Sequence, residues 1–306
     1  MNNILVFGHK SPDTDTITSS VVMANLEKML GNDAIACRLG NLNKETKFVF
    51  EYLGMEEPKL IEKVEKGQNV ILVDHNESKQ SADGINEANI LKVVDHHSID
   101  FKTGYPLFYH AEPVGCTATI LYKLYNQNNI EIEKNMAILM LSAIISDTLL
   151  FKSPTCTNQD KEVAQKLNEI AKLDIEKYGM EMLKAGTDLS DFSEEELIGL
   201  DAKEFEIANK NVVVAQINVV DINDVMLKKD KLEVAIKKVI SEKNLGLFFF
   251  AITDIINSNS QVIAIGEMAS IVEKAYNVKL NNNTALLEGV VSRKKQIIPV
   301  LTQSAQ

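Results

Sequence analysis

Four short segments of the sequence place carboxylate or imidazole side chains directly after an apolar run. They are His9-Lys10-Ser11-Pro12-Asp13-Thr14-Asp15, Asp74-His75, Asp95-His96-His97 and Ser146-Asp147-Thr148. Four of the five histidines lie within these segments. Carboxylates and imidazoles are common ligands of divalent metals, and several such clusters at neighbouring strand ends are what a two-metal site requires. The pattern therefore predicts a centre for two metal ions.

The first segment could serve both ions at once. Pro12 favours an extended turn, so the carboxylates of Asp13 and Asp15 can point to two adjacent positions. His9, at the end of a strand, supplies a nitrogen ligand. The alternative is that Asp13 or Asp15 only caps the helix that starts near Thr16. The three further clusters make metal binding the better interpretation.

Asp74 follows the wholly apolar run Val70–Val73 and could end a strand, cap a helix or bind a metal. Two divalent ions about 3.5–4 Å apart need a shared anionic ligand, and Asp74 is the candidate. Adjacent residues of an extended chain point to opposite sides. We therefore expect one of His96 and His97 to be a ligand, and the other to face the substrate or a supporting residue. His75 could orient a ligand.

Asp147 ends an otherwise apolar helix, where a buried carboxylate needs a cap or a metal ion as compensation. The four segments contain no cysteine. Carboxylate and imidazole ligands without a thiolate favour Mn(II), Mg(II) or Co(II) over structural zinc. Two such ions could lower the pKa of a bridging water enough to form a hydroxide nucleophile near neutral pH.

A basic run follows the strand expected at Ala285–Val291. Its sequence, Ser292-Arg293-Lys294-Lys295-Gln296, stands out in a chain with a formal net charge of -11. Arg293 offers a planar fork for phosphate oxygens, and Lys294 offers a point charge. The alternative is an ordinary solvated run. Lys203, which is flanked by acidic residues, is more typical of a surface position.

The composition of the 306 residues is that of a globular protein, with 45% hydrophobic and 25% charged residues. The net negative charge disfavours a nucleic-acid partner. Cys37, Cys116 and Cys156 have no Cys-x-x-Cys spacing and indicate reduced thiols. The apolar run Ile4–Phe7 is too short for a secretory signal, and no apolar stretch approaches the ~20 residues of a membrane span. These features predict a cytoplasmic enzyme without a membrane partner.

Short β-branched runs alternate with longer helical patterns up to about residue 186. Strands are expected at Ile4–Phe7, Ala34–Arg38, Val70–Val73 and Ile90–Val94, and helices at Thr16–Leu30, Cys116–Asn126, Lys134–Leu150 and Gln159–Ala171. This alternation predicts an α/β fold with a parallel sheet covered by helices on both faces. Ligands of such sheets bind beyond the carboxyl ends of the strands, where the acidic segments lie.

The sequence predicts a larger domain over residues 1–186, a linker over 187–193 and a smaller α/β domain over 194–306. A capping box at Ser193 to Glu196 starts the first helix of the smaller domain. Further strands are expected at Val212–Val220, Leu247–Thr253, Gln261–Ile265 and Ala285–Val291, and helices at Asp224–Ser241 and Met268–Tyr276.

Five segments in order resemble the family II inorganic pyrophosphatases, the manganese-dependent class of the DHH phosphoesterase superfamily. They are H-K-S-P-D-T-D from His9, V-D-H-N-E from Val73, V-V-D-H-H from Val93, I-I-S-D-T-L-L-F-K-S-P-T from Ile144 and S-R-K-K-Q from Ser292. A single D-H-H would be weak evidence. The five together span essentially the whole chain and are highly specific.

The resemblance implies a role for each matching residue. His9, Asp13 and Asp74 would hold one metal ion, and Asp15, Asp74, His96 and Asp147 the other. His97 would contact the substrate near the leaving phosphate. Lys203, Arg293 and Lys294 would bind phosphate oxygens from the second domain, which would be of the DHHA2 type. The phosphate-binding role is better supported for Arg293 and Lys294 than for Lys203, because the sequence that flanks Lys203 is less distinctive.

The resemblance also implies the reaction and its partners. Pyrophosphate carried with Mg(II) would enter a cleft between the domains, and domain closure would supply the cations. A hydroxide bridging two Mn(II) ions, for which Co(II) or Mg(II) could substitute, would attack one phosphorus in line. The enzyme would be a homodimer formed through the first domain. The roles of His75, Glu112, Thr117 and Thr119 stay open between supporting a ligand and packing.

Three other functions share part of this pattern. A related DHH phosphoesterase acting on polyphosphate or short oligonucleotides is the nearest, but the nucleotide-directed relatives carry a Gly-Gly-x-His motif and this sequence has no Gly-Gly pair. The haloacid-dehalogenase-type phosphatases share Asp13-Thr14-Asp15-Thr16 in form, but they need a late Gly-Asp pair that is also missing. A non-catalytic metal-binding protein would keep the ligands without needing the basic run.

Overall fold

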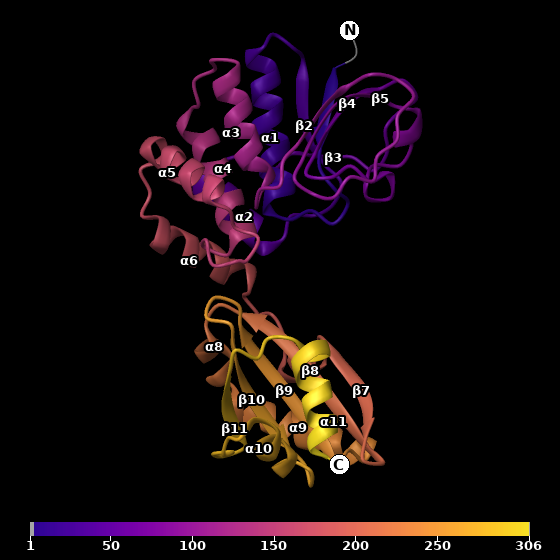
Figure 1. Cartoon of the computed structure of the whole chain (residues 1–306), viewed down its shortest axis with the longest axis vertical. Coiled ribbons are helices and arrows are strands. Elements are labelled where there is room, and N and C mark those ends of the chain that lie inside the picture. The colour runs from indigo at the N-terminus through magenta and orange to yellow at the C-terminus, as the bar shows by residue number, and fades with distance from the viewer. Residues whose placement is uncertain (1–2, 306) are drawn as a thin grey trace. The chain divides into compact units, whose positions relative to one another are not determined.

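The computed structural model describes residues 3–305 of the chain. These residues form two compact units, and the boundary between the units falls after Gly186. Each unit is built on its own β-sheet (Figure 1). No helix in the described part of the chain combines the length and the apolar character needed to cross a membrane.

The first unit contains a six-stranded parallel sheet in the order β3-β2-β1-β4-β5-β6. The strands are β1 (Ile4–Phe7), β2 (Ala34–Arg38), β3 (Lys59–Leu60), β4 (Asn69–Val73), β5 (Asn89–Asp95) and β6 (Phe108–Ala111). The expected parallel sheet is thus confirmed, and β3 and β6 are added at its edges. The strand order reverses between β1 and β4, and the carboxyl ends of strands beside such a reversal are where α/β sheets bind ligands.

The helices of the first unit gather on one side of its sheet (Figure 1). They are α1 (Thr14–Met29), α2 (Lys44–Leu53), α3 (Thr117–Gln127), α4 (Lys134–Thr148), α5 (Asn158–Ala171) and α6 (Ile175–Gly186). Helix α1 packs on β1, β2 and β4, and α3 packs on β5. Helix α4 packs on α1 and is buried almost continuously from Met136 to Ile145.

The prediction of helices on both faces of this sheet is wrong. The opposite face buries Phe7, Val70 and Leu72 against loop residues such as Val64 and Ala82. Among the described residues, this cluster contains no residue of an α-helix. The connection between β4 and β5, which lies entirely within the described residues, forms no long crossover helix. It contains two short 3-10 turns instead, η1 (Ser78–Gln80) and η2 (Ile85–Glu87).

The second unit contains a five-stranded sheet in the order β11-β10-β9-β8-β7. The strands are β7 (Ala202–Ile207), β8 (Lys210–Val219), β9 (Leu247–Asp254), β10 (Asn259–Ile265) and β11 (Thr284–Glu288). Only β8 and β9 pair in parallel; the other pairs are antiparallel. Lys203 therefore lies on an edge strand.

Helices cover both faces of the second sheet. One face packs against α7 (Glu194–Gly199), α8 (Ile222–Met226) and α9 (Lys229–Lys243). The other packs against α10 (Ser270–Tyr276), a π-helical turn η3 (Arg293–Ile297) and α11 (Ile298–Ser304). The capping box of Ser193 and Glu196 is confirmed. The single helix predicted at Asp224–Ser241 is wrong, because the chain forms α8 and α9 as separate helices.

Candidate functional site

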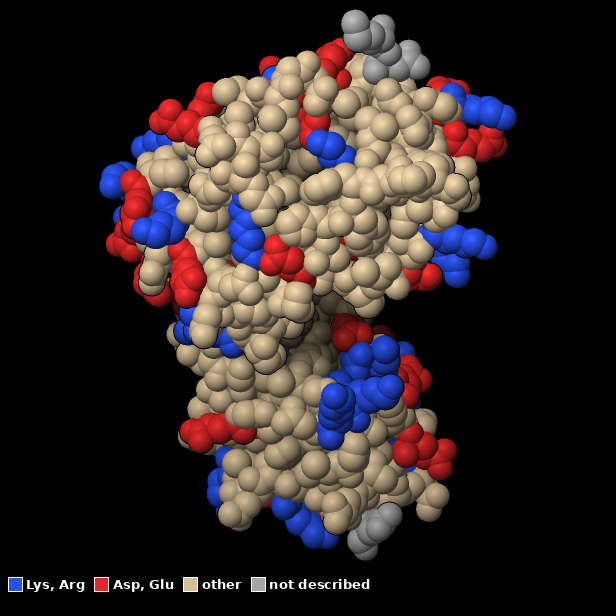
Figure 2. Space-filling view, turned by 45° about the horizontal axis from the view of Figure 1, so that its top comes forward, with Lys and Arg blue, Asp and Glu red and all other residues tan. Residues whose placement is uncertain are grey.

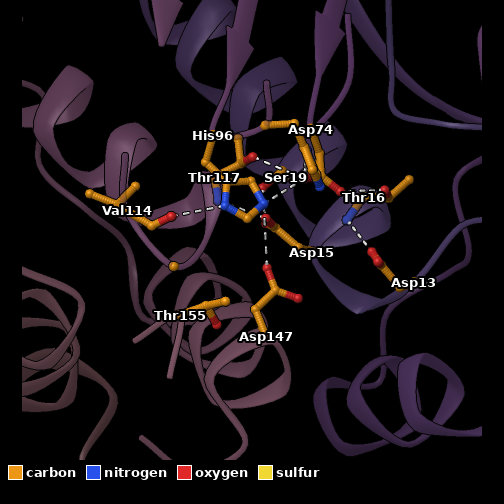
Figure 3. Close-up of polar contacts among 12 residues, drawn as sticks. Asp13, Asp15, Thr16, Ser19, Asp74, His96, Val114, Thr117, Asp147 and Thr155 are labelled. Carbon is orange, nitrogen blue, oxygen red and sulfur yellow. Dashed lines mark hydrogen bonds and ion pairs between the residues drawn. The ribbon is translucent and has the colours of Figure 1, made fainter. Parts of the chain in front are cut away.

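The predicted metal ligands of the first unit come together at the carboxyl ends of β1, β4 and β5. Three overlapping groups each bring their ligand atoms within 4.8 Å of one another. They are His9–Asp13–Asp74, Asp15–His96–Asp147 and Asp74–His96–His97. Figure 3 shows Asp15 of α1, Asp74 just after β4, His96 just after β5 and Asp147 of α4 converging. All six residues expected to bind metal fall in these groups.

Asp74 lies where the groups overlap. Its Oδ2 is 3.5 Å from Nε2 of His9, and its Oδ1 is 3.4 Å from Nε2 of His96. Atoms that each bind an ion at about 2.0–2.2 Å are separated from one another by distances of this order. The two oxygens of Asp74 thus face two different histidines. This arrangement fits two divalent ions that share one carboxylate.

The backbone and two hydroxyls hold Asp74 in this position. Its φ of 57° lies in the left-handed region, which costs a non-glycine residue about 1 kcal/mol or more. Its backbone N–H donates to the carbonyl of Val94 on the neighbouring strand. Thr16 Oγ1 donates to Oδ2 at 2.5 Å, and Thr117 Oγ1 donates to Oδ1 at 3.1 Å. The buried carboxylate is therefore fixed before any ion binds.

Asp13 and Asp15 both serve the start of α1, in different ways. Asp13 is the N-cap, since its Oδ1 accepts from the backbone N–H of Thr16, while its Oδ2 lies 3.5 Å from His9 Nε2. The capping alternative is thus correct for one oxygen of Asp13, and the other remains available for a metal. Asp15 is fully buried and accepts from Ser19 Oγ and from the backbone N–H of Thr117.

His96 and His97 are held by different partners. Nδ1 of His96 lies 3.0 Å from the carbonyl oxygen of Val114 and donates to it, so Nε2 is the ring atom that faces Asp74 and Asp147 and could bind a metal once it is deprotonated. Nδ1 of His97 lies 2.9 Å from Oδ1 of Asp95. The side chain of His97 is 52% exposed, whereas that of His96 is 15% exposed.

The buried carboxylates of the first unit repel one another, and added positive charge would stabilise them. Burial, reinforced by the Asp15 carboxylate, raises the pKa of Asp74 to about 7. Burial and the same neighbour raise the pKa of Asp147 well above its usual range. Burial opposes protonation of His96, but the Asp74 and Asp15 carboxylates outweigh it and raise the pKa of His96 to about 9. Bound divalent cations would remove this mutual repulsion.

These shifts predict that Mn(II) affinity rises with pH. A metal must displace the protons that the metal-free site holds: one on His96 below about pH 9, and another on Asp74 below about pH 7. Affinity should increase about tenfold per pH unit for each displaced proton. Calorimetry in buffers of different ionisation enthalpy should detect at least one proton released at pH 8 and more at pH 6. Binding without proton release would contradict this expectation.

All four undecided residues can be placed. Thr117 supports Asp74 and Asp15, as described above. His75 donates from Nδ1 to the carbonyl of Val73. Burial lowers the pKa of His75 to about 4 despite the opposing effect of that hydrogen bond, and the ring stays neutral. Glu112 accepts from His110 and Lys123 and belongs to none of the three ligand groups.

Thr119 belongs to a buried network around Asp160. Oδ1 of Asp160 accepts from Thr119 Oγ1 at 2.7 Å, and Oδ2 accepts from the backbone N–H of Gly115 at 2.9 Å. A Cβ atom at position 115 would meet Oδ2 at 2.8 Å, so any residue larger than glycine there would have to displace Asp160. The segment from Val114 to Thr117 supplies the carbonyl that binds His96, one of the two hydroxyls that bind Asp74, and the backbone N–H that binds Asp15. Asp160 therefore fixes the segment whose groups hydrogen-bond three predicted metal ligands, Asp15, Asp74 and His96.

Replacement of Asp160 by Asn should weaken Mn(II) binding about tenfold, because a displaced supporting segment loosens the ligands that it holds. The free energy of unfolding should fall by about 1–3 kcal/mol, since Asn cannot accept on both sides of its terminal group. Metal titration and thermal melting measure the two effects. Glu162→Gln, an exposed change on the same helix, is the control. Unchanged Mn(II) affinity in a folded Asp160→Asn protein would refute this role.

The second unit contributes a cationic cavity of about 510 Å³. Its lining includes Lys203 and Phe205 of β7, Gln216 and Asn218 of β8, and Arg293 and Lys294 of η3. All three cations predicted to bind phosphate thus line one cavity. Figure 2 shows lysine and arginine side chains gathered on one face of this unit. Such a concentration of positive charge in a chain of net charge -11 suits a small anion.

Gln296 explains the last position of the basic run. Its Oε1 accepts from the backbone N–H groups of Val291 and Ser292, both at 3.0 Å, and its Nε2 donates to the carbonyl of Gly289 at 2.7 Å. One side chain thereby closes the turn that leads from β11 into η3. Arg293 and Lys294 are presented from a braced turn as a result.

Sequence reasoning missed the residues that support the site: Thr16, Ser19, Asp160, Gly115 and Gln296. Most of their contacts join residues far apart in the chain, such as the 102 positions between Asp15 and Thr117. The hydroxyl-rich start of α1 was the one local signal, since Thr14, Thr16 and Ser19 are fully or almost fully buried there.

Comparisons with known proteins agree over the whole chain. The family model for the DHH family, N-terminal domain, matches residues 3–144, and that for the DHHA2 domain matches residues 180–304. The chain is 57% identical to the manganese-dependent inorganic pyrophosphatase of Bacillus subtilis (strain 168), with 99% of each protein covered. It is also 57% identical to a Bacillus velezensis protein named as a probable enzyme of the same kind.

Solved structures give the same result. A Methanococcus jannaschii protein, described as a family II inorganic pyrophosphatase, is 42% identical over 99% of both chains with a TM-score of 0.62. An exopolyphosphatase-related protein from Bacteroides fragilis shares the fold at 14% identity, covering 99% of this chain and 92% of its own, with a TM-score of 0.50. The chain therefore belongs to the family of manganese-dependent inorganic pyrophosphatases, and it carries that family's DHH and DHHA2 domains.

Proposed function

We propose that the protein hydrolyses inorganic pyrophosphate to two orthophosphates and depends on Mn(II). The observation that carries this proposal is that two ligand groups of oxygen and nitrogen atoms share Asp74. The name of the Bacillus subtilis relative, 57% identical over the full length, supports the substrate and the metal. The residues fit the ions, because the donor set contains no thiolate and its carboxylates repel one another without added positive charge.

His9, Asp13 and Asp74 would hold one Mn(II), and Asp15, Asp74, His96 and Asp147 would hold the other. When bound, the two ions supply Lewis acidity and an activated water. Co(II) or Mg(II) could replace them, and a further Mg(II) would accompany the substrate. The hydroxyls of Thr16 and Thr117 keep both oxygens of Asp74 in place for this task.

His97 and the cations of the second unit would act on the phosphate groups. The Asp95 carboxylate, despite the opposing effect of burial, raises the pKa of His97 and holds its Nδ1. Nε2 of His97 is then the ring atom left to hydrogen-bond a phosphate oxygen. Lys203, Arg293 and Lys294 would bind and neutralise phosphate oxygens, with the fork of Arg293 setting their orientation.

We further propose a cytoplasmic homodimer that binds no nucleic acid. The free thiols of Cys37, Cys116 and Cys156 suit a reducing compartment. The edge strand β6 exposes Phe108, which is 44% accessible, and could contribute to a subunit contact through the first unit. The net charge of -11 disfavours nucleic acid. Sedimentation at several protein concentrations tests the oligomeric state.

Phosphate release tests the function directly. Pyrophosphate, polyphosphate, a short oligonucleotide and a p-nitrophenyl ester should be compared with Mg(II) present, with and without prior loading by Mn(II). Fast release from pyrophosphate alone, increased by Mn(II), is the expected result. Preferred cleavage of polyphosphate or the oligonucleotide would transfer the function to a related phosphoesterase. Inactivity on all four substrates would favour the alternative of a non-catalytic metal-binding protein.

A further inference from the structure

Asp201 holds the guanidinium of Arg293 within the cationic cavity. Oδ1 of Asp201 accepts from Nη2 at 2.9 Å, and the backbone carbonyl of the same residue accepts from Nη1. The Arg293 side chain is only 12% exposed, whereas that of Asp201 is 51% exposed. Both residues line the cavity. A single residue thus binds both terminal nitrogens of the arginine.

The sheet fixes Asp201 in turn. Asp201 directly precedes β7, and the first residue of that strand, Ala202, pairs with Ala215 of β8. The carbonyl of Asp201 also accepts from the backbone N–H of Gln216 at 3.3 Å. Because side chains alternate along a strand, Asp201 and Lys203 share one face, and both line the cavity. The contact therefore places Arg293 relative to Lys203.

The two contacts leave a defined part of the arginine free. A guanidinium carries five N–H donors in a rigid planar fork. The hydrogen bonds of the described residues use Nη1 and Nη2 and leave the Nε–H of Arg293 without an acceptor. Holding the edge formed by Nη1 and Nη2 also orients the rest of the rigid guanidinium plane. The edge formed by Nε and the second N–H of Nη2 has the geometry that receives two phosphate oxygens.

A carboxylate in an anion site is otherwise unfavourable. Asp201 brings a negative charge into a cavity lined by Lys203, Arg293 and Lys294, and it should repel a bound phosphate. We propose that Asp201 is a positioning residue that aims Arg293 at the transferred phosphate, and that its orienting effect on turnover exceeds its repulsive effect on binding. This inference rests on the proposed pyrophosphatase function.

Steady-state kinetics of Asp201→Ala and Asp201→Asn test the inference. We expect kcat to fall about tenfold in Asp201→Ala, because an arginine free to rotate is oriented less often. The fall should be smaller in Asp201→Asn, which keeps an acceptor oxygen. KM should stay equal or decrease, because the repulsion is removed. An unchanged kcat, or a raised KM with kcat intact, would overturn the proposal.

A double-mutant cycle separates positioning from general support. Against an Arg293→Lys background, which has no fork to orient, Asp201→Ala should have almost no further effect on kcat. An equal loss in both backgrounds would show that Asp201 acts elsewhere. Glu267→Gln, which removes one carboxylate from the exposed pair with Lys210, is the matched control and should keep kcat. An active parent with unaffected Asp201 variants refutes the positioning role alone, whereas an inactive parent refutes the proposed function as well.

Discussion

Replacement of Asp74 by Asn should lower kcat for pyrophosphate hydrolysis by at least about 1,000-fold. Asp74 is the residue whose two oxygens face two different histidines, His9 and His96. Asn keeps the shape of the side chain but supplies one oxygen and no charge. One ion would lose a ligand. The negative charge that reduces the repulsion between the two ions would also be lost.

Metal content distinguishes this explanation from loss of folding. Metal analysis after desalting should show about one Mn(II) or less per chain in Asp74→Asn, against about two in the parent. Asp83→Asn is the control, since the Asp83 side chain is 76% exposed and, within residues 3–305, forms an ion pair only with Lys10. Near-parental turnover in Asp74→Asn, or full metal content, would refute the shared-ligand assignment.

The same substitution should stabilise the protein when metal is removed. Burial and nearby carboxylates raise the pKa of Asp74 to about 7 in the folded state, above the value of an exposed carboxyl. The folded state therefore holds a proton that the unfolded chain releases, and stability decreases as pH rises toward 7. Above that pH the ionised carboxylate is a standing cost that Asn does not carry. A higher melting temperature for metal-free Asp74→Asn than for the metal-free parent at pH 8 is the expected observation.

Local pattern was enough to locate the elements that carry the ligands. Strands β1, β2, β4 and β5 are mostly apolar runs, interrupted within β5 by Lys92, because a buried parallel strand contacts apolar neighbours on both faces. Each run ends where the chain leaves the core, so the polar residue that follows is visible in the sequence. The identity of Asp74 as a ligand candidate came from this position.

Other features depend on contacts that no local pattern contains. The left-handed backbone of Asp74 is not signalled by its residue type, since aspartate also adopts ordinary conformations. The covering of one sheet face by loops follows from apolar residues such as Val64 and Ala82, which are too scattered to form a periodic pattern. The contact of Asp201 with Arg293 joins residues 92 positions apart. Such pairs become visible only when the second sheet is assembled.

Replacement of Arg293 by Ala should lower kcat/KM for pyrophosphate by about 100- to 1,000-fold, the usual effect of removing a charge-stabilising donor. Arg293 is the cation of the cavity that offers several N–H donors in one plane. Arg293→Lys should recover only part of the loss, because lysine restores the charge without the fork.

The neighbouring lysine provides the control for this prediction. Lys295 belongs to the same basic run but does not line the cavity, so Lys295→Ala should change kcat/KM by less than about twofold. If the run acted only by its total charge, the two alanine variants would lose similar activity, and the assignment of Arg293 would fail. Mn(II) content should remain at the parental level in Arg293→Ala, because Arg293 belongs to none of the three ligand groups. Loss of turnover with metal retained in Arg293→Ala, set against loss of both in Asp74→Asn, would assign metal binding to the first unit and phosphate binding to the second.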